Sequence, residues 1–295
     1  MLKNHKKQFH DEIKHRAGVR CMTQYELKRV QQIYLDMVAD LFEMFAANRL
    51  NATLSGGSAL GAVRHHGFIP WDDDMDINMT RKDFERMKNL FDDYFHGKYI
   101  FRAPNHEYHS KYRCGKIENR RVIIRDENGL QHGLTIDVFQ IDNIPNSVIT
   151  RYIRGIRAEI YRIVAGLVFE YECLANVKKQ NDSFSIKKKI LYFAGFLFSY
   201  RNSEKWYDIV DRMYQFNDED SKLVGLPSGR KHYFGEVFPR EELTEAVSMN
   251  FENIVLPIPK GYDSYLRNLY GNYMIIPSEE QREHHYIYDI SFIDS

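Results

Sequence analysis

The chain of 295 residues is long enough to bury a substantial core in one large domain or two small ones. Its composition, 43% hydrophobic and 28% charged, is ordinary for a soluble globular protein and excludes an intrinsically disordered chain. The 41 basic residues balance the 41 acidic residues, so no global field draws the protein to nucleic acid, and no nucleic-acid partner is expected.

The cysteines and the N-terminal residues predict the compartment. Cys21, Cys114 and Cys173 are odd in number and far apart, which fits neither a disulfide framework nor a compact zinc motif. Residues 1–22 are expected to form a loose basic arm, with no signal peptide. A cytoplasmic location is the simplest prediction.

The first predicted elements are a helix and a short strand. Apolar side chains recur at three- and four-residue intervals between Gln24 and Ala47, which predicts an amphipathic helix. Residues 51–54 are expected to form a strand that leads into a Gly-Gly-Ser turn, and a second helix is expected to begin at Ala59.

The Gly-Gly-Ser turn is suited to an anion. Gly56 and Gly57 have no Cβ, so a phosphate can approach their backbone closely, and Ser58 is placed to cap the helix that follows. The N-terminus of that helix offers N–H donors to the same anion. Taken alone, however, the two glycines fit an ordinary strand-to-helix turn equally well.

An acidic strand is predicted within residues 68–78. Successive side chains of a strand face opposite ways, so Asp74 and Asp76 project to one side while Met75 and Ile77 enter the core. Two carboxylates on one face repel each other unless a cation lies between them. Because Mg²⁺ or Mn²⁺ takes such oxygen ligands together with phosphates and water, the pattern predicts a metal and phosphate site. The alternative, a solvated acidic loop, fits the apolar alternation poorly.

A helix and several strands are predicted next. Residues 81–94 have apolar side chains at helical spacing, with Thr80 placed as the N-cap. Three strands are then expected, the last two joined by a turn at Glu118 and Asn119: residues 99–102, 112–117 and 121–125.

The strand predicted for residues 134–141 contains one acid, Asp137, among apolar neighbours. An acid in such a run needs a partner. Two arrangements are open at this point. Either Asp137 lies beside Asp74 and Asp76 and completes an acidic triad, or it is a buried acid paired with an arginine.

The second half of the chain is predicted to be helical first and rich in strands later. Helices are expected over residues 148–173, 186–200 and 206–216, and strands over residues 233–238, 246–251 and 254–257. Residues 186–200 allow two interpretations, because three lysines precede a short apolar run. The segment is either a core helix with a solvated basic end or a helix that lies on an anionic membrane surface.

Two segments together resemble one known family. Residues 56–85 read GGSALGAVRHHGFIPWDDDMDINMTRKDFE, and residues 256–285 read LPIPKGYDSYLRNLYGNYMIIPSEEQREHH. Both are similar to signature segments of the LicD/fukutin family of phosphotransferases, within the nucleotidyltransferase-fold superfamily. The resemblance extends over most of the chain and is loose between residues 150 and 230.

The resemblance implies an α+β fold, with a nucleotidyltransferase-like mixed sheet, flanking helices and an additional mainly helical region. Four parts are expected: the arm at residues 1–22, a catalytic core at 23–147, a helical insertion at 148–230, and a C-terminal part at 231–295 that completes the catalytic domain.

The resemblance also implies roles for residues of this chain. Asp74, Asp76 and Asp137 are the expected catalytic acids and the ligands of Mg²⁺ or Mn²⁺. The donor's nucleotide and phosphate groups are expected to contact Gly56, Gly57, Ser58, Arg64, His284 and His285. Lys116 and Arg113 are added to that set because their predicted strand lies beside the site. Zinc binding by the adjacent His284 and His285 is not expected, because neighbouring side chains diverge.

The reaction implied is the transfer of phosphocholine or an alditol phosphate from a CDP-linked donor, such as CDP-choline or a CDP-alditol, with release of CMP. The expected acceptor is a hydroxyl of a glycan or lipid-linked glycan, such as a precursor of teichoic acid, lipopolysaccharide or capsular polysaccharide. A lipid-linked acceptor would be met at the cytoplasmic membrane face, with residues 187–200 as the peripheral contact.

Two other classes of protein remain open. One is a nucleotidyltransferase that moves NMP to a protein, an RNA or a small molecule and releases pyrophosphate. The other is a noncatalytic glycan- or nucleotide-binding protein, against which the retention of all three acids weighs.

Overall fold

The computed structural model of the chain describes residues 18–104, 113–126, 129–178, 186–282 and 285–293. The chain divides into two compact units. Unit 1 comprises residues 1–101, 116–138 and 246–295, and unit 2 comprises residues 102–115 and 139–245. The helices and the sheet occur together in one chain, which confirms the predicted α+β class.

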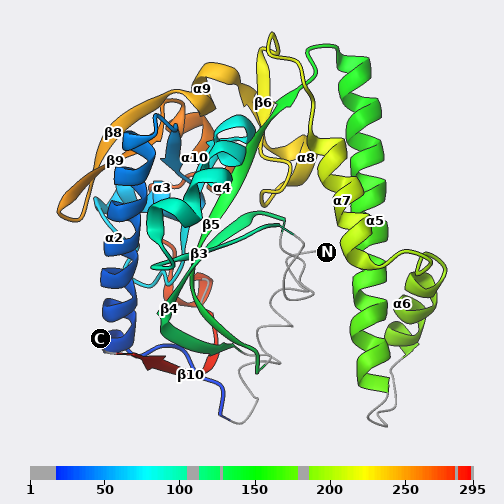
Figure 1. Ribbon diagram of the computed structural model, residues 1–295, viewed down its shortest axis with the longest axis horizontal. Helices are drawn as coiled ribbons and strands as arrows, with labels where there is room; N and C mark the ends of the chain where they lie inside the picture. The colour runs from blue at the N-terminus through cyan, green and yellow to red at the C-terminus, as the bar shows by residue number, and fades with distance from the viewer. Residues whose placement is uncertain (1–17, 105–112, 127–128, 179–185, 283–284, 294–295) are drawn as a thin grey trace. The chain divides into compact units, whose positions relative to one another are not determined.

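A sheet with the strand order β1-β2-β5-β4-β10 forms the centre of unit 1 (Figure 1). These strands are β1 (Ala52–Leu54), β2 (Met75–Thr80), β5 (Gln131–Ile144), β4 (Gly115–Asp126) and β10 (Ile287–Phe292), and β3 (Ile100–Arg102) also pairs with β4. β1 runs antiparallel to β2, with Leu54 opposite Ile77. The strand order makes β2, which carries Asp76 and directly follows Asp74, a direct neighbour of β5, which carries Asp137.

Helix α2 (Gln24–Ala47) has the bounds that its periodicity predicts, and it runs alongside the sheet (Figure 1). It begins with a capping box, in which Thr23 and Glu26 bond each other's backbone N–H. On its buried face, Tyr34 OH donates to Thr135 O of β5 over 3.0 Å. The helix is therefore tied to the strand that carries Asp137.

Among the described residues, the remaining elements of unit 1 are three helices, a hairpin and a short 3-10 turn. They are α3 (Gly56–His65), α4 (Arg81–Phe95), α10 (Tyr262–Tyr270), the hairpin β8 (Ala246–Phe251) and β9 (Ile254–Pro259), and η1 (Glu279–Gln281). Thr80 caps α4 as predicted, because its side chain accepts from Asp83 N–H. The predicted hairpin is likewise confirmed.

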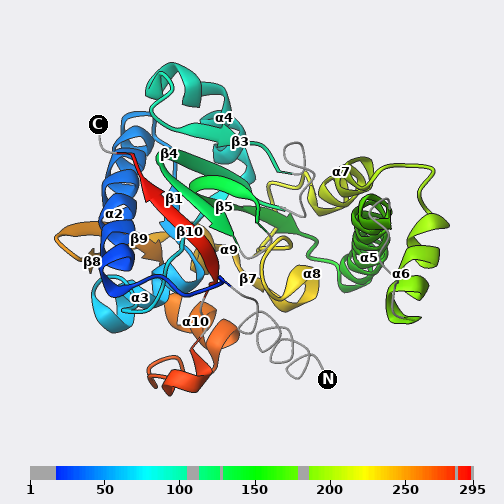
Figure 2. The same cartoon turned by 90° about the horizontal axis from the view of Figure 1, so that it is seen from below.

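Unit 2 is mainly helical. Its long helix α5 (Val148–Lys178) lies between α6 (Ile186–Phe196) and α7 (Ser203–Tyr214) in both views (Figures 1 and 2). The smaller elements are β6 (Leu223–Gly225), α8 (His232–Gly235), β7 (Val237–Pro239) and α9 (Arg240–Thr244). Val168, Trp206, Val210 and Tyr233 belong to its buried core. Within the described ranges, no helix has both the length and the apolarity that crossing a membrane requires.

Two local predictions are wrong. Glu118 and Asn119 lie inside β4 and not in a turn; Glu118 is buried because its carboxylate accepts a 2.9 Å hydrogen bond from Gly133 N–H. Residues 233–238 begin as helix α8 and become a strand only at Val237. In both cases contacts with distant segments override the local preference. Strand β10 was not predicted at all.

Candidate active site

The Gly-Gly-Ser turn begins helix α3, at the end of strand β1. Gly56 has φ +47°, which a residue with a side chain adopts at a cost, and a Cβ there would lie 3.0 Å from Asp76 Oδ2. A Cβ at Gly57 would lie 2.8 Å from Asp72 Oδ2. The two glycines therefore allow acidic side chains to lie directly against the first turn of α3.

Backbone and hydroxyl contacts hold the acidic strand to this turn. Ser55 N–H donates to Asp76 O over 2.9 Å, and Asp76 N–H donates to Ser58 Oγ over 2.9 Å. Ser58 was predicted to cap α3, and this is wrong, because the helix already begins at Gly56 with Ser55 at the N-cap. The Ser58 hydroxyl positions Asp76 instead.

The first turn of α3 keeps N–H groups available for an anion. Gly56 N–H donates to Tyr265 OH over 3.1 Å, and Ala59 N–H donates to Ser55 O. Among the described residues, the N–H groups of Gly57 and Ser58 have no such acceptor. Two donors at a helix N-terminus suit a phosphate oxygen.

Three acids of the WDDDMD run interact strongly with each other. Burial, followed by the charge of Asp74, raises the pKa of Asp72 and of Asp76 well above the usual range. Burial also raises the pKa of Asp74, whose carboxyl group is hydrogen-bonded to that of Asp72. A hydrogen bond between two carboxyl groups requires a shared proton. Burial and mutual repulsion therefore disfavour full ionisation of these acids.

Asp137 joins this cluster from the neighbouring strand β5. Its charge contributes to the raised pKa of both Asp74 and Asp76. Its carboxylate also forms an ion pair with Lys116 Nζ of β4, between side chains that are 25% and 12% exposed. Asp137 thus lies near the other two acids and has a cationic partner, which is a lysine and not the arginine of the second interpretation.

The donor chemistry at this point consists of carboxylate oxygens, which suits a hard divalent cation such as Mg²⁺ or Mn²⁺. Across the part of the chain that the structure describes, no three His, Cys, Asp or Glu side chains are already grouped to hold a metal ion. Lys116 contributes the positive charge beside Asp137. The metal role of Asp74, Asp76 and Asp137 stays a prediction.

The other predicted cations have protein partners. Arg64 donates from Nη1 to Tyr273 O over 2.7 Å and from Nε to His65 Nε2 over 3.0 Å, so it holds the segment after α10. Arg113, in unit 2, donates to His232 Nδ1 over 3.3 Å. Phosphate contacts by these two arginines stay a prediction.

The histidine pair of the C-terminal segment is described only in part, because His284 lies outside the described residues. His285 Nδ1 lies 2.6 Å from Asp73 Oδ1, and this hydrogen bond raises the pKa of His285. Three residues before it, the Arg282 guanidinium stacks 4.1 Å from the ring centre of Trp71. The C-terminal segment therefore contacts both ends of the Trp71–Asp73 sequence.

Two tyrosines of α10 belong to the site and were not predicted. Tyr265 OH contacts Ser55 Oγ over 2.9 Å as well as Gly56 N–H, and Tyr270 OH lies 3.6 Å from the position that a Cβ of Gly56 would take. Both lie in the second family-like segment, residues 256–285, so that segment was the available signal. Its own pattern did not indicate that α10 folds onto the glycine turn.

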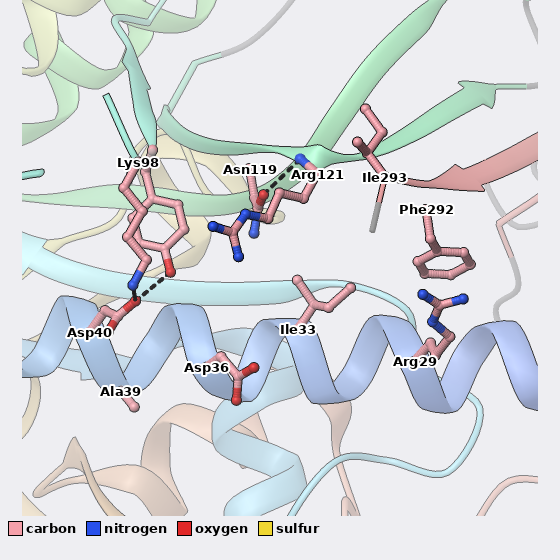
Figure 3. A pocket seen from close by; sticks show the side chains of 11 residues that line it. Arg29, Ile33, Asp36, Ala39, Asp40, Lys98, Asn119, Arg121, Phe292 and Ile293 are labelled. Carbon is pink, nitrogen blue, oxygen red and sulfur yellow. Dashed lines mark hydrogen bonds and ion pairs between the residues drawn. The ribbon is translucent and has the colours of Figure 1, made fainter. Parts of the chain in front are cut away.

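A pocket of about 560 Å³ between α2, β4 and the end of β10 is separate from this cluster (Figure 3). None of the predicted site residues lines it. Asp40 accepts hydrogen bonds from Lys98 and Tyr99, and the Arg29 guanidinium stacks 4.0 Å from the ring centre of Phe292. The Lys98–Asp40 contact is an ion pair within this lining, whereas the predicted acids gather at the acidic cluster, which is therefore the candidate site.

A sheet with acids on two adjacent strands and a glycine turn against them is the arrangement that the resemblance to the nucleotidyltransferase-fold superfamily implies. Comparison with known proteins agrees: residues 49–152 match the family model described as LicD/FKTN/FKRP, nucleotidyltransferase domain. This segment contains the glycine turn and all three acids, and it confirms the resemblance to the LicD/fukutin family.

The similarity extends beyond that domain. The chain is 26% identical over 263 residues to the lipopolysaccharide cholinephosphotransferase LicD of Haemophilus influenzae, covering 88% of this chain and 96% of that protein. Over 56 residues it is 38% identical to uncharacterized proteins of Rickettsia prowazekii and Rickettsia typhi, covering 19% of this chain and 21% and 18% of those proteins.

Proposed function

We propose that this protein transfers a substituted phosphate, phosphocholine or an alditol phosphate, from a CDP-linked donor to a glycan hydroxyl, with release of CMP. The observation that carries the proposal is the placement of Asp76 against the first turn of α3, beside Asp137 of the next strand. Similarity to a cholinephosphotransferase over 88% of the chain supports the choice of the group transferred.

The residues of the turn bind the donor's phosphates. The N–H groups of Gly57 and Ser58 donate to phosphate oxygens, while Tyr265 holds Gly56 in its left-handed conformation. Asp74, Asp76 and Asp137 are the residues that would hold Mg²⁺ or Mn²⁺, which when bound supplies positive charge for the attacking and leaving oxygens. Burial and the charges of neighbouring carboxylates raise the pKa values of Asp74 and Asp76, so a bound cation would stabilise the ionised form of both groups.

Lys116 and Asp137 act on the acceptor side of the reaction. Asp137 accepts the proton of the incoming hydroxyl at a carboxylate oxygen, and the ion pair with Lys116 fixes the orientation of that carboxylate. His285 and Arg282 hold the Trp71–Asp73 sequence, from which the acidic strand continues. Each of these side chains therefore orients an acid or moves a proton.

The acceptor proposed is a precursor of a cell-surface glycan, such as lipopolysaccharide, teichoic acid or capsular polysaccharide. The cholinephosphotransferase that the chain resembles is named for lipopolysaccharide. If the precursor is lipid-linked, the enzyme meets it at the cytoplasmic face of the membrane.

A nucleotidyltransferase that releases pyrophosphate is the second candidate, because the same acidic cluster serves both reactions. Purified protein with Mg²⁺ or Mn²⁺ is incubated with CDP-choline, CDP-ribitol or CDP-glycerol, and separately with nucleoside triphosphates. We expect CMP from at least one CDP-linked donor, with acceptor-dependent stimulation.

The same assays contain the tests against the proposal. Release of pyrophosphate from a nucleoside triphosphate, without release of CMP from any CDP-linked donor, would show that the protein is a nucleotidyltransferase. A folded Asp76→Asn variant that still releases CMP at the wild-type rate would remove the acidic cluster from the mechanism. Binding of donors without turnover by wild-type protein would indicate a noncatalytic binding protein.

A further inference from the structure

Helix α5 of unit 2 carries a row of exposed isoleucines, here called the α5 stripe: Ile149, Ile153, Ile156, Ile160 and Ile163. Their side chains are between 52% and 73% exposed. The spacing of four and three residues places all five on one face of the helix. Single exposed apolar residues are common, but a continuous row marks a docking surface.

Helix α6 and the turn after it carry a second row, here called the α6 stripe: Ile186, Ile190, Phe193, Leu197 and Tyr200. Each of these residues is more than half exposed. The interpretation of this segment as a core helix is therefore wrong for these residues. The other face of α6 packs on α5, where the rings of Tyr171 and Tyr192 are 4.8 Å apart. Two neighbouring helices thus each leave one apolar face uncovered by unit 2.

The charges beside the two stripes are positive. Residues 148–163 contain four arginines and a single carboxylate, Glu159. The oxygens of Glu159 are engaged by Arg162 Nε over 2.7 Å and by Tyr233 N–H over 3.4 Å, whereas Arg157 is exposed. Residues 186–201 contain three lysines and one arginine and no acid. Arg154 instead donates to two backbone oxygens of unit 2, so the exposed cations described in these two segments are Arg157, Lys189 and Arg201, and neither segment has an exposed carboxylate among its described residues.

We propose that the α5 and α6 stripes dock together on the surface of an anionic phospholipid bilayer. The apolar rows enter the headgroup boundary, while the exposed cations Arg157, Lys189 and Arg201 remain among the lipid phosphates. A second copy of the chain is the competing occupant, but it would bring two positively charged surfaces together, which is unfavourable. The docking itself does not depend on the proposed function. This inference rests on the proposed function only for the biological role of the docking, which would bring the enzyme to a lipid-linked acceptor.

The test is co-sedimentation of the full chain with vesicles of phosphatidylcholine alone or with added phosphatidylglycerol. Wild type is expected to pellet with the anionic vesicles. High salt is expected to release it, because each cation near the bilayer surface contributes about fivefold or more to the affinity at low salt. Ile156→Glu/Ile160→Glu is expected to lose binding by at least about tenfold. The uncharged variant Ile156→Ser/Ile160→Ser separates lost apolar contact from added repulsion, and it is expected to bind more weakly than wild type.

The matched control is Leu130→Glu/Val255→Glu, which removes two exposed apolar side chains of unit 1, 64% and 62% exposed, and adds the same charge. It is expected to bind like wild type. Circular dichroism checks that every variant is folded, which the exposure of the replaced side chains favours.

Three results would overturn the inference. They are failure of wild type to bind anionic vesicles, equal binding by the α5 variants, and a wild-type dimer by light scattering that the α5 variants dissociate without any vesicle binding. The assay uses no CDP-linked donor. Protein that binds vesicles but releases no CMP would therefore refute the proposed function alone.

Discussion

Lys116 of β4 and Asp137 of β5 form an ion pair inside the acidic cluster, and Lys116 also lowers the pKa of Asp76, against the larger effects that raise it. One cation thus partly compensates several carboxylates. Because the two residues lie on neighbouring strands of one sheet, their contact depends on the strand order and not on any local pattern.

Replacement of Lys116 by methionine is expected to lower kcat/KM for CMP release by about 10- to 100-fold, because the orientation of Asp137 is lost. The same change removes a positive charge beside the acids, so Mn²⁺ is expected to bind about tenfold more tightly. Steady-state kinetics and calorimetric titration with Mn²⁺ measure the two effects. Lys98→Met, which breaks the ion pair with Asp40, is the matched control. Weaker Mn²⁺ binding by Lys116→Met than by Lys98→Met would contradict the assignment.

Asp76→Asn is expected to abolish turnover and yet stabilise the metal-free protein. The raised pKa of Asp76 means that the folded state disfavours its charge, so folding stability falls as pH rises from the unfolded value of about 3.9 through the folded pKa. The neutral amide of asparagine does not ionise, so the variant does not lose this folding stability as pH rises. Urea unfolding in the presence of a chelator should therefore show a larger stabilisation near pH 7 than near pH 4. Asp92→Asn, on the exposed side of α4, is expected to change stability by less than about 0.5 kcal/mol.

Gly56→Ala is expected to destabilise the protein by about 1–3 kcal/mol, because its backbone is left-handed and the new methyl group would approach Asp76. CMP release should fall with it, since Asp76 must move. Gly166→Ala, in the middle of α5 where a Cβ meets nothing within 4 Å, should instead stabilise by about 0.5–1 kcal/mol. Equal free energies of unfolding for the two variants would show that the turn is not strained.

Glu26→Gln should weaken the start of α2 in a pH-dependent way. The Arg20 guanidinium and the Thr23 N–H bond the Glu26 carboxylate and lower its pKa to about 2. A lowered pKa gives stability that is present above the unfolded value of about 4.3 and is lost as pH falls through the folded value. We expect Glu26→Gln to cost about 0.5–1 kcal/mol near neutral pH and progressively less as pH falls toward about 2. Glu43→Gln, at an exposed position of the same helix, is the control. A change in the free energy of unfolding by Glu26→Gln that does not depend on pH would argue against a stabilising role of the Glu26 charge.

Local sequence patterns were sufficient to predict much of the secondary structure of this protein. The bounds of α2, the Thr80 cap of α4 and the hairpin β8–β9 follow from side-chain periodicity and from the chemistry of caps and turns, which act between residues close in sequence. The alternation of Asp74 and Asp76 with Met75 and Ile77 is likewise local, since both apolar side chains are fully buried as predicted.

Only the tertiary structure determined which residues each face of a helix or strand contacts. Glu118 continues a strand because Gly133 N–H satisfies its carboxylate, and Asp137 has a lysine partner because β4 lies beside β5. Periodicity could show that α5 and α6 each have an apolar face, but not that those faces stay exposed. The physical reason is the same in each case: burial and electrostatics depend on residues distant in sequence, and their positions are set only when the whole chain packs.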